Sequence, residues 1–233
     1  MNVILLAGGL GKRLRPVVQD VPKPLAPVAG RPFLEHLMDY WIGQGATCFV
    51  LSVGYKYEMV ETHFGTAYRS VPVEYAVENE PLGTGGGLLL ALAKARAEGS
   101  VFAANGDTFF AVDAAAMRRY HVARGALFTM ALFRSTDTAR YTPVERGTEG
   151  RITAMNASAS GAPPLANGGV YLIEPEAFSR TGFRSGDRVS LESELLPALL
   201  RAGVCVFGFE SEARFIDIGV PDDYARALQV LPA

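Results

Sequence analysis

The sequence predicts an α/β fold built on a mostly parallel sheet. Short apolar runs alternate with amphipathic helical patterns from residue 2 to residue 133. Within most runs the apolar residues are continuous, whereas a half-exposed strand would alternate apolar with polar residues. Strands that are apolar on both sides belong to sheets that helices cover on both faces.

These patterns give the elements of the first half in chain order. The run at the N-terminus predicts the first strand, and a Leu- and Ala-rich stretch predicts the last helix before residue 100. The helix that follows residue 112 has an aspartate at its N-cap position. Strands are expected at Asn2–Ala7, Thr47–Val53, Val73–Val77, Val101–Ala104 and Ala126–Phe133, and helices at Pro32–Gln44, Glu58–Phe64, Gly85–Arg96 and Asp113–Arg124.

The pattern changes after residue 134. Residues 135–165 are polar, rich in Gly, Ser and Thr, and contain two adjacent prolines, which predicts an inserted hairpin or loop excursion. We therefore expect one domain over residues 1–233 with a lid-like insertion. Beyond it the expected strands are Val170–Ile173, Val204–Phe209 and Phe215–Ile218, and the expected helices are Ser190–Arg201 and Pro221–Leu228, the latter with Asp222 and Asp223 in its first turn.

The amino-acid composition limits which kinds of molecule this protein is expected to bind. The 233 residues include 22 basic and 24 acidic ones, a formal net charge of −2, which argues against a general nucleic-acid or membrane binder. No apolar run approaches the length of a membrane span, and the N-terminal run is too short for a signal peptide. Cys48 and Cys205 lie far apart in apolar segments, typical of buried free thiols. We expect a cytoplasmic protein, with a homo-oligomer left open.

The most distinctive stretch is LLAGGLGKRLRP, residues 5–16. The first apolar run is followed there by a loop that contains three glycines and then three cationic residues. Glycines let backbone N–H groups close on an anion, and cations neutralise it. Lys23, held between two prolines in PKPLAPV, adds a rigidly presented cation. We expect a polyphosphate to bind here; the alternative is a glycine-rich turn with solvated cations.

Two commoner phosphate motifs fail on these residues. A P-loop needs Ser or Thr after Gly-Lys, but Arg13 follows Lys12. A dinucleotide fingerprint needs a third glycine where Leu14 stands. The failed fingerprint disfavours an NAD-dependent oxidoreductase.

Six motifs together resemble those of the sugar-1-phosphate nucleotidyltransferases, in family order over nearly the whole chain. Two shared stretches, VLSVGYKYE and FLEHL, most resemble the branch that acts on D-glycero-α-D-manno-heptose 1-phosphate with GTP. The resemblance implies a Rossmann-like three-layer fold with a mostly parallel mixed sheet and Mg²⁺ as cofactor. The six motifs are LLAGGLGKRLRP, PKPLAPVAGRP, EPLGTGG, NGDTFF, NGGVYLI and FIDIGVPDDY.

The resemblance also implies catalytic roles. Arg13 would stabilise the leaving pyrophosphate as a forked donor, and Lys23 would reach the phosphates from the opposite side as a point charge. Asp107 and Asp217 would bind Mg²⁺, which prefers carboxylate oxygens. By itself, Asp107 is equally well explained as a turn residue. The nucleotide contacts expected are Leu6, Ala7, Gly8, Gly9, Gly11, Lys12, Arg13, Lys23, Glu78, Gly83, Thr84, Asn105, Gly106 and Asp107.

Glu78 is the residue expected to read the base. Guanine offers two adjacent donors, and an ionised carboxylate only accepts, so Glu78 could accept both. Uracil, with one imide donor between two carbonyls, would meet it poorly. The alternative is a solvated loop acid. Gly83 leaves room for the base, and Thr84 is expected to cap the following helix.

The sugar contacts expected from the resemblance are Tyr141, Asn167, Gly168 and Gly169. Relatives commonly carry Glu-Lys-Pro after the strand that ends near Met155, and the lysine contacts the sugar phosphate. Here Asn156-Ala157-Ser158 stands in that place, so another cation must serve. The candidates are Arg151, Arg184 and Arg188.

The predicted function is transfer of GMP from GTP to D-glycero-α-D-manno-heptose 1-phosphate, giving GDP-heptose and pyrophosphate. Two alternatives stay open. One is a sibling enzyme that uses mannose, glucose or an amino-sugar 1-phosphate with GTP, UTP, dTTP or CTP. The other is a non-catalytic module that senses nucleotide sugars.

Overall fold

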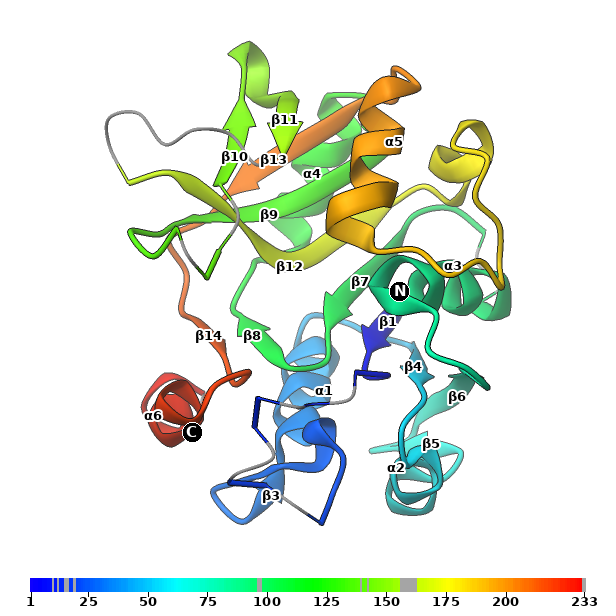
Figure 1. The fold of residues 1–233 in the computed structure, drawn as a ribbon, viewed down its shortest axis with the longest axis vertical. Coiled ribbons are helices and arrows are strands. Elements are labelled where there is room, and N and C mark those ends of the chain that lie inside the picture. Colours follow the sequence, from blue (N-terminus) through cyan, green and yellow to red (C-terminus); the bar gives the residue numbers. More distant parts are fainter. Residues whose placement is uncertain are drawn as a thin grey trace.

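The protein, described from a computed structural model, is a mixed α/β fold around one large sheet (Figure 1). The structure describes residues 1–9, 11, 13–14, 17–18, 20–95, 98–138, 140–141, 143–155 and 163–231. The main sheet has the spatial order β6–β4–β1–β7–β12–β9–β13, in which β12 alone of these seven strands runs antiparallel to its neighbours. These strands are β1 (Asn2–Leu6), β4 (Cys48–Val53), β6 (Val71–Val77), β7 (Val101–Asn105), β9 (Phe128–Arg134), β12 (Leu165–Ile173) and β13 (Val206–Glu210). The predicted mostly parallel sheet is confirmed.

Helices cover both faces of this sheet, as the continuous apolar strands predict. The aspartate expected to cap the fourth helix does so, since Asp113 Oδ1 accepts from Ala116 N at 2.9 Å. The last helix begins with Pro221, as predicted. The helices are α1 (Phe33–Gly43), α2 (Tyr57–Phe64), α3 (Gly83–Ala95), α4 (Ala114–Ala123), α5 (Leu196–Arg201) and α6 (Pro221–Val230).

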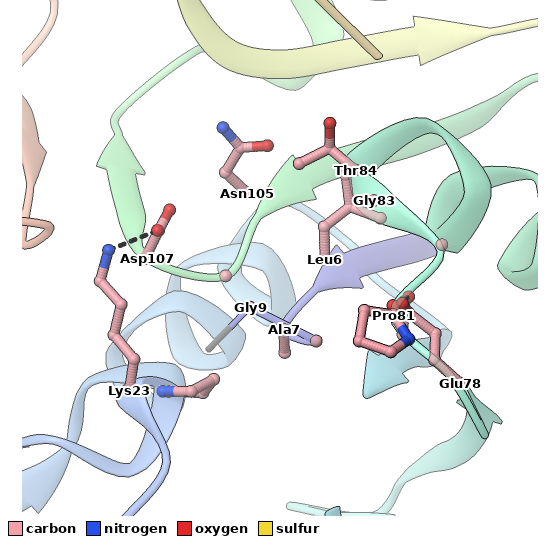
Figure 2. Close-up of a pocket in the computed structure, with 15 residues that line it drawn as sticks. Leu6, Ala7, Gly9, Lys23, Glu78, Pro81, Gly83, Thr84, Asn105 and Asp107 are labelled. Carbon is pink, nitrogen blue, oxygen red and sulfur yellow. Dashed lines mark hydrogen bonds and ion pairs between the residues drawn. The ribbon is translucent and has the colours of Figure 1, made fainter. Parts of the chain in front are cut away.

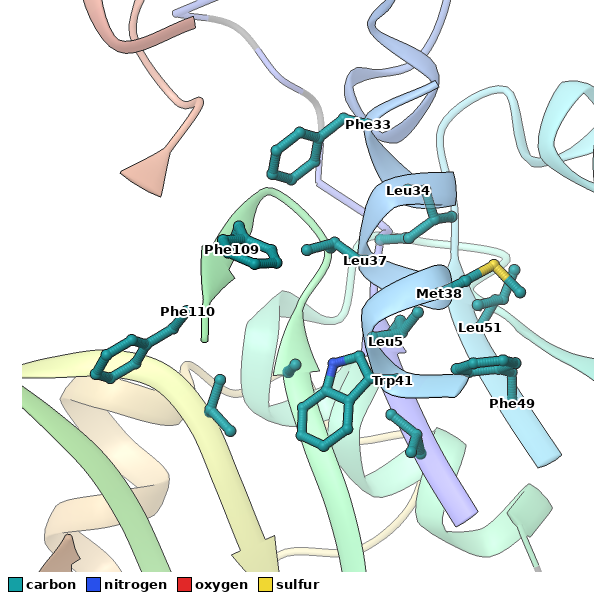
Figure 3. Packing of buried hydrophobic residues seen from close by; sticks show 14 of the residues in the cluster. Leu5, Phe33, Leu34, Leu37, Met38, Trp41, Phe49, Leu51, Phe109 and Phe110 are labelled. Carbon is teal, nitrogen blue, oxygen red and sulfur yellow. The ribbon is translucent and has the colours of Figure 1, made fainter. Parts of the chain in front are cut away.

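Each strand divides its side chains between two hydrophobic clusters. In β1, Val3 and Leu5 belong to the cluster under α1, whereas Ile4 belongs to the cluster under α3 and α5. This alternation follows from the two-residue period of a strand. Figure 3 shows the first cluster, which includes Trp41 of α1 and Phe49 of β4. The Trp41 ring packs against Phe102 of β7, with ring centroids 5.2 Å apart. Because both faces are buried, the functional groups collect at the ends of the strands.

Shorter elements complete the fold: β2 (Pro27–Val28), β3 (Arg31–Pro32), β5 (Ala67–Tyr68), β8 (Thr108–Phe110), β10 (Pro143–Arg146), β11 (Ile152–Met155) and β14 (Phe215–Asp217). Within the excursion, β10 and β11 form an antiparallel hairpin, and β10 also pairs with the start of β12. The antiparallel pair β8–β14 brings Thr108 opposite Asp217. No helix of the described residues is both long and apolar enough to cross a membrane.

Some local predictions were wrong. The helix expected at Ser190–Arg201 begins as a π-helical turn, Leu191–Leu195, before α5. β12 starts five residues earlier than expected, because it continues through the Asn-Gly-Gly sequence as an irregular strand with a register shift. Both cysteines are free, but each is only half-buried.

Candidate active site

The largest cluster of predicted site residues lies at the carboxyl end of β1. Strand β1 lies between β4 and β7, so the strand order reverses there. Such a switch point leaves a crevice in which α/β proteins bind ligands. A pocket of about 340 Å³ opens at this point (Figure 2). It is lined by Leu6, Ala7, Gly8, Gly9, Lys23, Pro24, Ser52, Glu78, Pro81, Gly83, Thr84, Gly87, Asn105, Gly106 and Asp107.

Glu78 stands at one end of the pocket. Its Oε2 accepts from Leu82 N at 2.9 Å and its Oε1 from Ser52 Oγ at 3.3 Å. A Cβ on Gly87 would lie 2.8 Å from Oε1, so the glycine leaves the space that the carboxylate occupies. Burial raises the pKa of Glu78, and the two hydrogen bonds oppose this rise. Ser52 and Gly87, which lie beside this carboxylate, were not among the predicted site residues.

The opposite end of the pocket holds a cation between two carboxylates. Lys23 Nζ lies 2.5 Å from Asp107 Oδ2 and 3.9 Å from Asp217 Oδ1. Only 9% of the Lys23 side chain is exposed. Asp107 follows β7 and Asp217 ends β14, so the β8–β14 pairing brings these distant residues together. Spacing in the sequence gave no sign of this meeting; only the resemblance implied it.

Arg140 is a second cation at Asp217, and the sequence analysis missed it. Its guanidinium donates to Asp217 O at 2.8 Å, and its Nη2 lies 3.2 Å from Asp217 Oδ2. It also pairs closely with Asp223, which pairs with Arg226. These two arginines hold the pKa of Asp223 below its ordinary value, although burial opposes them. The only signal in the sequence was its place directly before Tyr141.

The glycine loop is described in part. Gly8 and Gly9 line the pocket, and Gly11 adopts φ +58° with the stem of Lys23 beside it. Arg13 is exposed and is not among the lining residues. Lys12 lies outside the described residues.

Thr84 does not cap α3, contrary to expectation, because the helix begins one residue earlier at Gly83. Its hydroxyl instead joins α3 to the segment before α5: Oγ1 donates to Glu192 Oε2 at 2.9 Å and accepts from Leu191 N at 3.0 Å. The amides of Gly85 and Gly86 both donate to Val189 O at 3.0 Å. The turn that closes the Glu78 end of the pocket is therefore braced from outside.

The residues expected to contact the sugar lie beside the pocket rather than in its lining. Gly169 adopts φ +71°, and a Cβ there would lie 2.6 Å from Asn105 Nδ2. Asn167 donates to the buried Tyr171 hydroxyl at 2.7 Å and accepts from Gly169 N at 3.0 Å. Asn105 Oδ1 is buried without a partner within the described structure. An acceptor left free at the pocket wall suits a ligand hydroxyl.

Tyr141 and the three candidate arginines lie outside the pocket lining. The Tyr141 ring packs edge-on against Phe133 and Phe215, and burial raises its pKa to about 12. The candidates for the sugar phosphate are all exposed: Arg151, Arg184 and Arg188. Residues 156–158, where relatives carry the lysine motif, lie outside the described residues.

The donor set at Asp107 and Asp217 fits a hard divalent cation. Two carboxylates, one from the turn after β7 and one from the end of β14, already share one positive group, the Lys23 ammonium. Mg²⁺ commonly takes one or two protein carboxylates and completes its shell with water and phosphate oxygens. No group of three or more His, Cys, Asp or Glu within the described residues forms a complete protein cage. The pair therefore suits a metal that arrives with phosphates.

The known proteins to which this chain is similar include several nucleotidyltransferases. The family described as Nucleotidyl transferase matches residues 2–232. The chain is 40% identical to the D-glycero-alpha-D-manno-heptose 1-phosphate guanylyltransferase of Aneurinibacillus thermoaerophilus, over 99% of this chain and 98% of that protein. It is 33% identical to the mannose-1-phosphate guanylyltransferase of Mycobacterium tuberculosis, over 97% of this chain but 63% of that protein.

Solved structures agree with this grouping. HddC from Yersinia pseudotuberculosis superposes with a TM-score of 0.82 at 30% identity, and the match covers 98% of both chains. The same protein complexed with GMP-PN gives a TM-score of 0.81 at 29% identity. With the family match extending from residue 2 to residue 232, this chain belongs to the nucleotidyl transferase family.

Proposed function

We propose that this protein transfers GMP from GTP to D-glycero-α-D-manno-heptose 1-phosphate, releasing pyrophosphate and forming GDP-heptose. One observation carries the proposal. A single pocket presents a carboxylate that only accepts hydrogen bonds at one end and a cation with paired carboxylates at the other. A nucleotide has the matching polarity, with donors on guanine and negative charge on its phosphates. The full-length relative named for this reaction supports the choice of sugar.

The base is proposed to lie against Glu78. Guanine N1–H and its 2-amino group are adjacent donors, and each oxygen of an ionised carboxylate keeps a lone pair beyond the one used by Leu82 or Ser52. Gly83 and Gly87 also line the same end of the pocket.

The phosphates are proposed to lie along Gly8 and Gly9 toward Lys23. A phosphate oxygen of the sugar 1-phosphate attacks the α-phosphorus while the bond to the β-phosphate oxygen breaks in line with it. The nucleophile is already an anion, so the chain need not supply a general base; its task is to orient two anions and stabilise the departing charge. Lys23 and Arg13 are proposed for that charge, and Asp107 and Asp217 for Mg²⁺, which would neutralise the phosphates when bound.

The sugar is proposed to bind on the β12 side of the pocket. Gly168 and Gly169 let the backbone approach there, Asn105 Oδ1 is an unpaired acceptor, and Asn167 is held in place by Tyr171. Tyr141 is proposed to border this region from the excursion. No candidate arginine lines the pocket. Lys23 and Arg140, which both lie against Asp217, are therefore proposed as the cations for the sugar phosphate.

The test is pyrophosphate release with GTP, UTP, dTTP and CTP, each crossed against heptose, mannose, glucose and N-acetylglucosamine 1-phosphates. GTP with the heptose phosphate should give the highest kcat/KM. Release with GTP and mannose 1-phosphate instead would favour the second candidate, a mannose-1-phosphate guanylyltransferase, which the similarity to the mycobacterial relative supports. Preference for UTP would contradict the role of Glu78. No release with any pair would contradict the proposal as a whole.

A further inference from the structure

The cation end of the pocket contains its own positive charge. Lys23 Nζ contacts Asp107 at 2.5 Å and approaches Asp217 within 3.9 Å, and the side chain is largely buried (Figure 2). The same two carboxylates are the ones proposed above for the metal. A lysine ammonium thus lies between the two carboxylates.

We propose that Lys23 and the divalent metal compete for this pair of carboxylates, so that the free enzyme takes up metal together with the nucleotide and not before it. On binding, the Lys23 ammonium leaves the carboxylates for the phosphates. This inference rests on the proposed function, because it uses the same carboxylates and the same triphosphate.

Charge explains why the two cations exclude each other. Adding a divalent ion between Asp107 and Asp217 while Lys23 remains there would place three positive charges against two negative ones. Arg140 already lies against Asp217 and adds to the positive field. Like charges at such separations repel, and the repulsion is stronger where one of them is buried, as the Lys23 side chain is at 9% exposure. A triphosphate removes the conflict because it brings negative charge for both the metal and the displaced ammonium.

The geometry lets the side chain move while its backbone stays fixed. Lys23 starts a short 3₁₀ turn between Pro22 and Pro24, whose rings fix the backbone φ on both sides. Its stem lies against Gly11: a Cβ there would be 3.1 Å from the Lys23 Cβ. At the far end, a Cβ on Gly219 would lie 3.1 Å from Nζ. The glycine loop and the carboxylates therefore both lie within reach of one flexible side chain.

The experiment measures Mn²⁺ binding to the nucleotide-free enzyme by electron paramagnetic resonance, which counts free Mn²⁺ and needs no turnover. Lys23→Met removes the charge and keeps the stem. We expect its Mn²⁺ affinity to rise on the order of tenfold or more, while turnover with GTP falls. Lys23→Arg keeps the charge, so its Mn²⁺ affinity should stay as low as in the unmodified protein.

Nucleotide coupling gives a second readout. A non-hydrolysable GTP analogue should tighten Mn²⁺ binding strongly in the unmodified enzyme and much less in Lys23→Met, because linkage requires the released lysine for the full effect. Lys94→Met, which removes a charge from an exposed position of α3, is the matched control and should change neither value. Adding Asp107→Asn to Lys23→Met should abolish the gained affinity.

Two failures are distinguishable. If Mn²⁺ binds in a way that depends on Asp107 but Lys23→Met leaves the affinity unchanged or lowers it, the competition is wrong and the proposed metal site survives. If Mn²⁺ does not bind at Asp107 in any variant, with or without the nucleotide analogue, both the competition and the proposed metal role are wrong.

Discussion

Single charged residues stand at the two ends of the pocket, Glu78 at one and Lys23 at the other. Glu78 is held by Leu82 N and Ser52 Oγ, so its carboxylate presents a fixed edge to the pocket. The family resemblance and the chemistry of guanine together singled out Glu78 in the sequence. It could not foresee Ser52, which lies 26 positions away and gave no sign in the sequence beyond a polar residue in an apolar strand.

Glu78→Gln should lower kcat/KM for GTP roughly tenfold to a hundredfold. The amide oxygen can still accept one hydrogen bond from guanine, but it is uncharged, and the amide NH₂ group would face the second donor of the base. Steady-state kinetics with GTP would measure this loss. Glu80→Gln, an exposed neighbour in the same turn, should leave kcat/KM unchanged. An unaffected GTP reaction in Glu78→Gln would remove Glu78 from base recognition.

The raised pKa of Glu78 also determines how this residue makes the stability of the fold depend on pH. Burial favours the neutral form in the folded protein, so ionising Glu78 costs stability. This cost in stability is absent below pH 4.5, the ordinary pKa of a glutamate, and is fully present above the raised pKa that Glu78 has in the folded protein. Glu78→Gln should therefore melt at a temperature equal to or above that of the unmodified protein at pH 7.5, even as it loses activity. A lower melting temperature would mean that the carboxylate stabilises the fold.

Asp107→Asn and Asp217→Asn should each reduce pyrophosphate release by roughly a hundredfold or more, since one charged contact at a phosphoryl-transfer site typically contributes that much. Circular dichroism should show the folded state retained in both. Asp222→Asn, an exposed aspartate in the first turn of α6, is the control and should turn over normally. Normal turnover in either of the first two variants would exclude that aspartate from the reaction.

At the scale of elements, the glycines at the start of α3 are explained by close packing against residues 187–191 and not by helix propensity. Gly86 faces the backbone of the segment before α5: a Cβ there would contact Asp187 O and lie 2.6 Å from Leu82 Cβ. Three consecutive glycines are poor helix formers, which is why the sequence predicted the helix body better than its start. Tertiary packing against residues 187–191 explains their presence.

Gly86→Ala should destabilise the protein by about 1–3 kcal/mol, because backbone atoms cannot yield to the added methyl group. The substitution would otherwise gain roughly 1 kcal/mol of helix propensity. Gly43→Ala at the end of α1 meets nothing within 4 Å and should be neutral or stabilising. Urea unfolding of both variants measures the difference. If Gly86→Ala were as stable as Gly43→Ala, the backbone around α3 would have to shift easily to accept the methyl group.

How far the sequence predicts the elements depends on where their signals come from. The parallel strands and α1, α2, α4 and α6 follow from local periodicity and capping, and the structure confirms each. The π-helical start before α5 and the strand β8 do not, because both depend on partners far along the chain. The same holds for Arg140, whose contacts with Asp217 and Asp223 join residues about eighty positions apart.

At the scale of the whole molecule, a buried histidine should make folding depend on pH. His121 lies between Thr129 Oγ1 at 2.7 Å and Glu174 Oε1 at 3.3 Å. Burial lowers its pKa below the ordinary 6.5, with Glu174 opposing. Between pH 6.5 and the lowered folded pKa, the unfolded chain takes up a proton that the folded protein resists, so stability should fall as pH falls.

His121→Gln should flatten that part of the curve. Thermal melting at pH 7.5, 6.5 and 5.5 would compare the two proteins, and the unmodified protein should lose more melting temperature over this interval. Parallel curves for both would show that His121 does not contribute to the pH dependence.

The bracing of the α3 turn by residues 189–192 has a consequence for redesign. A transplant of residues 78–87 from a relative would have to preserve five hydrogen bonds to a segment about a hundred positions away, two of them made by the Thr84 hydroxyl. A chimera that also carries residues 189–192 of the same relative should be more stable than the single transplant, because the turn and the segment that braces it lie in two separate stretches of chain.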